Sequence, residues 1–166
     1  ALKIQLVNSD RVTKNNKDIA NAAQWLLDNI EKTNALLEST PIQELSDRIN
    51  LLPKEKVEWV RTGVSIHFNG TETHDKCLFC NSDIYNSYEL LKHFSEDVVR
   101  ATDEIDSLIR QIETHTTTLA KLESPTSEQT ANANKLRSIF DQAVPVLIEK
   151  RNAISTKKDL ISIDSD

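Results

Sequence analysis

The sequence predicts an all-α protein, an antiparallel three-helix coiled-coil bundle with a small β-hairpin at its tip. Over three long stretches, apolar residues recur at steps of three and four, which is the spacing of helices that bury a single stripe. Only two glycines and four prolines occur among 166 residues, too few for the many turns of a strand-rich fold. We divide the chain into a first coiled-coil helix with two short helices (1–63), a tip (64–83) and an antiparallel helix pair (84–166).

The first long helix is predicted over about residues 11–39. Residues 1–11 fit two structures, because their apolar residues alternate as in a short strand and also suit the frayed start of a helix. Asn16 occupies the one gap in the stripe of the long helix. The stripe itself comprises Val12, Ile19, Ala23, Leu26, Ile30, Thr33 and Leu37.

Two short helices are expected to follow, as a bracket at one end of the bundle. Thr40, Pro41 and Gln43 give the first an N-cap, a first-turn proline and a capping-box partner. The second begins after Pro53 and ends at Gly63, which we expect to act as its C-cap.

The tip is predicted to be a β-hairpin. Residues 64–68 alternate between apolar and polar side chains, as a short strand does. Asn69-Gly70 is a dipeptide typical of hairpin turns, and residues 76–78 are expected to form the returning strand. This arrangement would place the only two cysteines of the chain at the end of the hairpin.

The second long helix is predicted over about residues 85–122 and has the clearest heptad seam of the chain. His115 is the one polar residue in it, and we expect a neutral imidazole with a hydrogen bond across the seam. The apolar members are Leu91, Phe94, Val98, Ala101, Ile105, Leu108, Ile112, Leu119 and Leu122.

The third long helix is expected to begin at Ser124 and Pro125, as N-cap and first helical residue. Pro145 lies inside its pattern and is expected to kink the helix, because proline lacks the backbone N–H. Its stripe comprises Ala133, Leu136, Phe140, Ala143, Leu147 and Ile154.

Composition excludes several classes of function. The net charge of -6 disfavours direct binding to nucleic acid, whose phosphates would repel the chain. No apolar run approaches the roughly 20 residues of a membrane span. Phosphate-binding glycine loops and a nucleophile elbow are both missing, so we expect no catalysis from this segment. A single close cysteine pair fits a reducing, cytoplasmic compartment. The absence of methionine leaves two origins open, a removed initiator or a segment of a longer chain.

Cys77 and Cys80 are the candidate metal ligands. Two thiolates separated by two residues grip one metal ion from a single tight turn, and zinc is the metal that this spacing favours. Asn81 follows at a position where such turns use a left-handed residue, which asparagine tolerates. The alternatives are structural thiols without a ligand, and a redox pair or disulfide.

A tetrahedral zinc needs two ligands more than the cysteines provide. His67 and His74 are close in sequence and are compatible with a Cys₂His₂ site within one chain, although each also suits an exposed hairpin residue. The other possibility is a Cys₄ site shared by two copies on a two-fold axis. We favour the single-chain site, because the predicted tip is longer than a bare turn requires. His93 is interpreted as an ordinary helix residue.

The Trp-Val-Arg-Thr-Gly segment at 59–63, then His67, then Cys-Leu-Phe-Cys at 77–80 together resemble a known family. This family is the AAA-type P-loop ATPases related to the bacterial anticodon nucleases PrrC and RloC. There, Trp-Val-x-x-Gly-Leu and a histidine precede Cys-Pro-Phe-Cys-Gly between coiled-coil arms. Here, Leu78 replaces the proline and Asn81 the glycine, and residues 147–152 are similar to a further family segment. The resemblance implies a separate nucleotide-binding head and a tip similar to a zinc hook, in which coil apices join through shared zinc.

Two functions follow from these observations. The first is a non-catalytic interaction module of a larger AAA-type ATPase, which binds a protein partner or a second copy through the coil and the tip. The second is a free-standing zinc-knuckle adaptor that binds a protein or RNA ligand. A redox enzyme is a more distant third.

Overall fold

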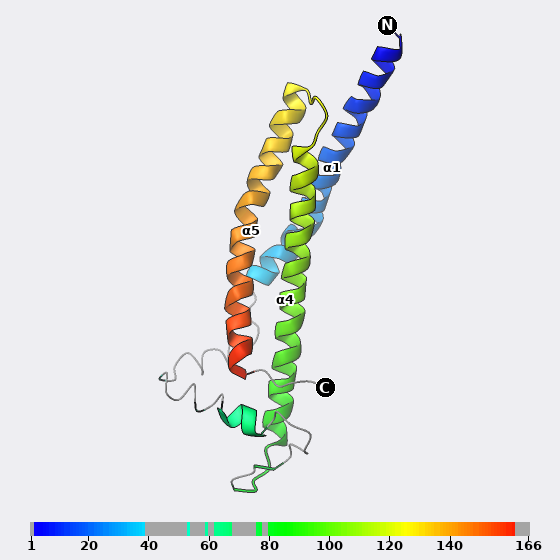
Figure 1. The fold of residues 1–166 in the computed structure, drawn as a ribbon. Coiled ribbons are helices and arrows are strands. Elements are labelled where there is room, and N and C mark those ends of the chain that lie inside the picture. The colour runs from blue at the N-terminus through cyan, green and yellow to red at the C-terminus, as the bar shows by residue number, and fades with distance from the viewer. Residues whose placement is uncertain are drawn as a thin grey trace. The chain divides into compact units, whose positions relative to one another are not determined.

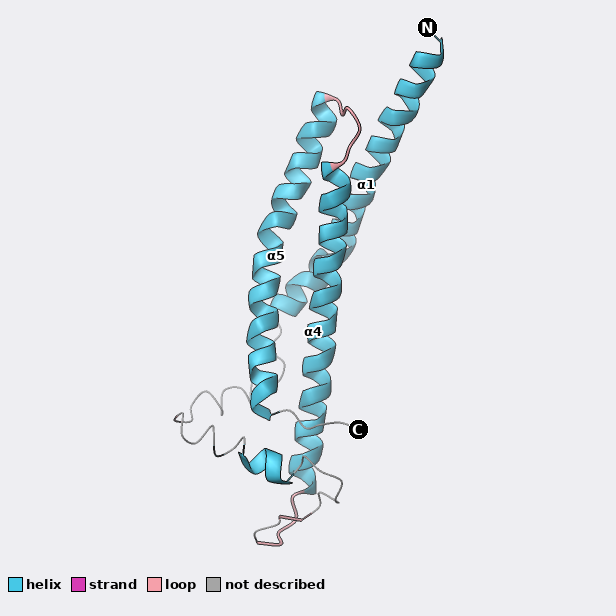
Figure 2. Ribbon diagram, viewed as in Figure 1, coloured by secondary structure: helices cyan, strands magenta, loops and turns pink. Residues whose placement is uncertain are grey.

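The computed structural model describes residues 2–38, 53, 59, 62–67, 76, 77 and 80–161. Figure 1 shows three long helices, which are α1 (Leu2–Glu38), α4 (Tyr85–Ala120) and α5 (Ser127–Ile161). In Figure 2 the described residues are helices and loops, without a strand among them. The predicted all-α class is therefore confirmed. None of the described helices combines the length with the apolar composition that a bilayer span requires.

The helix boundaries resolve one alternative that the sequence left open. Helix α1 is already formed at Leu2, so residues 2–11 are the start of a helix, and the strand interpretation is wrong. A helix satisfies its backbone hydrogen bonds within its own segment, whereas a strand needs a neighbouring strand. The alternation of three apolar residues was too short a pattern to distinguish the two.

The chain divides into two compact units, and α4 and α5 each contribute to both. Unit 1 comprises 1–38 and 105–149, and unit 2 comprises 39–104 and 150–166. The division into segments 1–63, 64–83 and 84–166 remains a prediction. Both predicted bracket helices lie largely outside the described residues.

The core of unit 1 follows the predicted seams of α4 and α5 closely. Leu108 and Leu147 are among the most deeply buried side chains of the protein, and Ile112 is 3% exposed. Aliphatic side chains at this spacing remove a continuous apolar stripe from water, which is the main favourable term in folding. The buried apolar residues of unit 1 are Ala22, Ile105, Leu108, Ile112, Leu119, Ala133, Phe140 and Leu147.

The predicted stripe of α1 needs a correction. Ile30 is 46% exposed, whereas Asn15 and Ala22, which are outside the predicted stripe, are buried. The buried face of α1 is therefore centred on a line through Asn15 and Ala22. Asn15 lies on the buried face because its side chain makes hydrogen bonds there, and an apolar pattern does not reveal such bonds.

Those hydrogen bonds tie α1 to the α4–α5 connection. Asn15 Nδ2 donates to the Glu123 carbonyl at 3.1 Å and to Gln129 Oε1 at 3.2 Å. Gln129 Nε2 in turn donates to the Val12 carbonyl at 3.0 Å and to Asn16 Oδ1 at 2.7 Å. Because Asn15 and Gln129 are both buried, these bonds are made in a setting of low dielectric and fix the register of α1.

The start of α5 also differs from the prediction. Thr126 and Gln129 form the capping box: the Thr126 backbone N–H donates to Gln129 Oε1, and the Gln129 N–H donates to Thr126 Oγ1. The predicted cap at Ser124 and Pro125 is wrong. Ser124 instead takes a positive φ of 39° and turns the chain before the helix begins.

Unit 2 contains a short helix where a strand was predicted. Residues 62–67 are helical, so the strand assignment is wrong for the described part of 64–68. Gly63 lies inside this helix and has no positive φ, so it is not the predicted C-cap. Val64 is buried and Ile66 is 58% exposed, which shows that the apolar alternation did not define one buried face of a strand.

Candidate metal centre

The two cysteines lie on a tight turn that is closed by backbone hydrogen bonds. Lys76 and Asp83 form an isolated antiparallel bridge, and the Cys77 N–H donates to the Ser82 carbonyl at 2.8 Å. The Asn81 N–H donates back to the Cys77 carbonyl at 2.8 Å. Asn81 has a φ of 56°, which confirms the left-handed residue predicted after the second cysteine. The turn leads into α4, where the Tyr85 N–H donates to Asp83 Oδ1 at 3.0 Å.

The short helix in unit 2 brings a histidine to the first thiol. His67 Nε2 lies 3.3 Å from Cys77 Sγ, and His67 Nδ1 lies 2.9 Å from the Gly63 carbonyl oxygen. A carbonyl oxygen can only accept, so Nδ1 carries the ring proton. In the neutral imidazole this leaves the lone pair of Nε2 directed at the thiol, which is the tautomer that binds a metal.

The second thiol is the more accessible of the two. Cys80 is exposed and Cys77 is half-buried, and neither thiol is part of a disulfide. Cys80 Sγ lies 3.1 Å from Ser82 Oγ. Ser82 therefore contacts the turn twice, through its carbonyl to Cys77 and through its hydroxyl to Cys80.

The spacing of these donors is compatible with zinc. With Zn–S of about 2.3 Å and Zn–N of about 2.0 Å, a sulfur and a nitrogen in a tetrahedral site lie about 3.5 Å apart. The separation of His67 Nε2 from Cys77 Sγ is 3.3 Å. A metal-binding histidine commonly donates its other ring N–H to a carbonyl, as His67 does to Gly63. The sequence named His67 as a ligand but did not predict that a helix would hold it.

The described donors do not complete a site. No three histidine, cysteine or acidic side chains in the described part of the chain lie close enough to hold a metal. Contacts of the described residues join His67 to Cys77, whereas Cys80 contacts Ser82. His74 lies outside the described residues. The donor chemistry fits zinc, and the closing ligands remain a prediction.

His115 lies apart from the cysteine turn and belongs to an aromatic cluster in unit 1. Its ring centroid is 5.3 Å from Trp25 and 6.2 Å from Phe140, and Trp25 meets Phe140 edge-on at 5.9 Å. Trp25 Nε1 also donates to Gln111 Oε1 at 2.8 Å. Burial lowers the pKa of His115, which agrees with the predicted neutral imidazole. Its described contacts are with these rings, so the predicted hydrogen bond across the seam is not confirmed.

The fold and the turn together define a class of protein: long α-helices that carry a Cys-x-x-Cys turn at the start of one of them. Residues 3–166 match the sequence model of the AAA domain family, and the chain belongs to that family. No curated protein and no solved structure matches it significantly. The AAA-type resemblance is thereby confirmed at the level of the family, and the closer likeness to the anticodon nucleases remains a prediction.

Proposed function

We propose that this chain is a non-catalytic coiled-coil interaction module of a larger AAA-type ATPase, with a zinc-binding turn at Cys77 and Cys80. The observation that supports the metal is the chain of contacts from the Gly63 carbonyl through the His67 ring to Cys77 Sγ. Membership in the AAA domain family supports the larger ATPase. The similarity of residues 59–80 to the relatives of the anticodon nucleases favours a parent protein of that kind.

The proposed ligands are Cys77, Cys80, His67 and His74. Bound zinc would supply a cross-link between the 62–67 helix and the turn, since a structural zinc contributes folding energy directly. His67 presents Nε2 because Gly63 holds its Nδ1 proton. Asn81 adopts the left-handed backbone conformation that closes the turn, a conformation that a β-branched residue would adopt only with strain.

The helices are proposed to form an antiparallel three-helix coiled-coil bundle. Helices α4 and α5 are joined by the short connection at 121–126, and α1 contacts both near Trp25. A long helical pair with a metal turn suits the joining of protein surfaces, either to a partner or to a second copy. We propose a cytoplasmic setting, in which the thiols stay reduced and available to zinc.

Zinc content and molecular mass, measured on the same purified sample, test this function. A single-chain site predicts one zinc per chain in a monomer that survives dilution. A shared site predicts half a zinc per chain in a dimer that a chelator splits. Cys77→Ser and His67→Gln should each lower the zinc content, and His115→Gln serves as the matched control, because that histidine belongs to the aromatic cluster. Zinc-free protein with unchanged stability in Cys77→Ser would refute both forms.

A further inference from the structure

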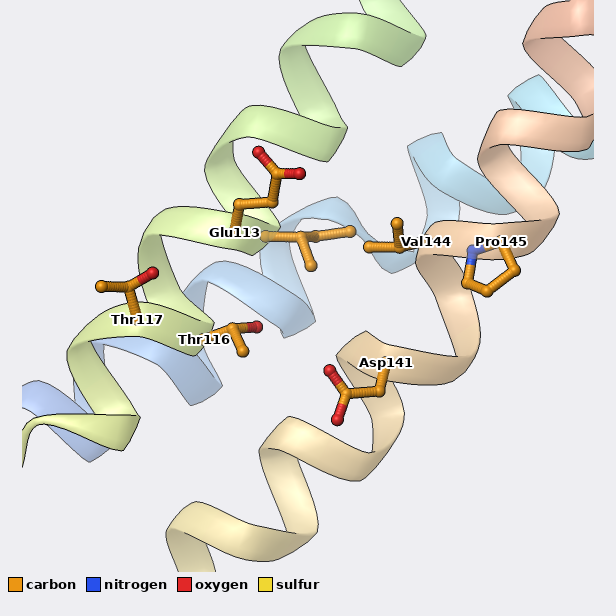
Figure 3. Close-up of a pocket in the computed structure, with 7 residues that line it drawn as sticks. Glu113, Thr116, Thr117, Asp141, Val144 and Pro145 are labelled. Carbon is orange, nitrogen blue, oxygen red and sulfur yellow. The ribbon is translucent and has the colours of Figure 1, made fainter.

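An open groove of about 310 Å³ runs between α4 and α5 in unit 1. Figure 3 shows its two walls, with Glu113 and two threonines on one helix and Asp141, Val144 and Pro145 on the other. Val144 and the Asp141 carboxylate are directed across the groove toward α4 (Figure 3). The complete lining is Ile112, Glu113, Thr116, Thr117, Asp141, Val144 and Pro145.

Pro145 changes the chemistry of the groove. In an α-helix the residue at this position would donate its N–H to the Asp141 carbonyl, four residues earlier. Proline has no N–H, so this carbonyl loses its ordinary intrahelical donor. Asp141 therefore combines a side-chain carboxylate at the groove with a backbone carbonyl that lacks its usual i+4 donor.

The polar side chains of the groove are available for a ligand. Within the part of the chain that the structure describes, Glu113 and Asp141 have no ion-pair partner, and the Thr116 and Thr117 hydroxyls have no hydrogen bond. Both carboxylates are exposed. All four groups can accept a hydrogen bond, and the two carboxylates give the groove a negative charge.

An apolar surface continues from the groove along α5. Asp141, Val144, Pro145 and Ile148 are spaced three, one and three residues apart, and so lie on one face of the helix. Ile148 is 41% exposed although it is a large aliphatic residue. An exposed aliphatic surface beside a groove is typical of a site where an amphipathic helix docks.

We propose that this groove binds an amphipathic helix of a partner protein, which inserts one arginine or lysine from its apolar stripe between Glu113 and Asp141. The apolar stripe would cover Val144, Pro145 and Ile148. The inserted cation would meet the two carboxylates. A groove between two helices suits a third helix, because side-chain ridges pack into such grooves.

Charge determines this choice of occupant. A second copy docked on a two-fold axis would bring the Glu113 and Asp141 carboxylates of both copies together, which is unfavourable. A basic helix turns the same carboxylates into attractive contacts. The proposal specifies the partner of the interaction module and rests on that role, but its test requires no metal.

The test uses a designed helical peptide of about 18 residues, long enough to be helical in isolation. The peptide has a leucine stripe with one central arginine, and a control peptide has glutamine in place of the arginine. Binding to the full chain is followed by backbone amide NMR shifts. We expect the arginine peptide to shift the amides of Thr116, Thr117 and Val144, and to bind about fivefold more tightly than the control.

Removal of both groove charges should abolish this preference. The Glu113→Gln, Asp141→Asn double variant is expected to bind the two peptides equally, while Asp10→Asn, Glu31→Gln, which removes two exposed carboxylates from α1, should keep the preference. Circular dichroism checks that both variants fold. Absence of binding, equal binding of both peptides to the unchanged chain, or self-association that the groove variant abolishes would each overturn the proposal.

Discussion

The α4–α5 seam in unit 1 and the cysteine turn in unit 2 are stabilised in different ways. The seam consists of aliphatic residues repeated over many helical turns, so no single contact decides whether it forms. Among its described residues, the turn between Lys76 and Asp83 is closed by backbone hydrogen bonds of Cys77 and Asn81, and its side chains are exposed apart from the half-buried Cys77. A repeated apolar pattern supplies its own driving force, whereas our proposal gives the short turn its order through bound zinc.

The largest expected effect is a charge in the seam. Ile105 is fully buried, so Ile105→Asp removes an aliphatic side chain and adds an unpaired carboxylate. We expect a loss of about 4 kcal/mol or more in the free energy of unfolding. Urea denaturation followed by circular dichroism measures it. Ile139→Asp is the matched control, since Ile139 is 46% exposed, and its change should stay near 0.5 kcal/mol, in the range of roughly neutral surface substitutions. Equal losses in the two variants would mean that Ile105 is not packed.

A smaller effect is expected at the polar centre of unit 1. Asn15→Ala removes the donor to the part-buried Glu123 carbonyl and one of the two donors to Gln129 Oε1, which keeps the Thr126 N–H. The expected loss is about 1–3 kcal/mol, the cost of unsatisfied buried polar groups. Gln24→Ala on the exposed side of α1 provides the comparison, because its hydrogen bond to Asp28 is exposed. If Asn15→Ala matches Gln24→Ala, the network does not hold α1 in register.

The smallest effect concerns pH. The pKa of His115 is lowered from its ordinary 6.5 by burial, so the folded state binds this proton less readily than the unfolded state. The contribution of His115 to the free energy of unfolding is therefore fully present above about pH 6.5, and it is lost as the pH falls toward the folded pKa. Denaturation midpoints at several pH values should show a shallower decline in His115→Gln. An identical pH dependence would show that His115 is not the group responsible.

Much of the helical fold could be predicted from the sequence, and the exceptions have physical causes. The α4 seam was correct at Ile105, Leu108 and Ile112 because heptad spacing follows directly from helix geometry. The stripe of α1 was misplaced because Asn15 is buried through hydrogen bonds made with residues more than a hundred positions away. Apolar periodicity carries no information about such pairs.

The metal ligands remain a prediction, and the local structure around them was predicted only in part. Cys-x-x-Cys spacing and the left-handed Asn81 were recognisable, since both reflect the local chemistry of the turn. The helix at 62–67 was missed because five alternating residues fit a strand as well as a helical turn. One signal was available: His67 is four residues after Gly63, the spacing at which a helical side chain reaches a backbone carbonyl.

Cobalt substitution tests the central claim, that His67 and the two cysteines bind one metal ion, most directly. Cobalt(II) occupies tetrahedral zinc sites and gives intense visible bands together with thiolate-to-metal charge transfer in the near ultraviolet. The account predicts both signals in the unchanged chain, loss of most charge transfer in Cys77→Ser, and altered visible bands in His67→Gln with charge transfer retained. Weak bands of a six-coordinate ion in the unchanged chain, unaffected by either substitution, would contradict it.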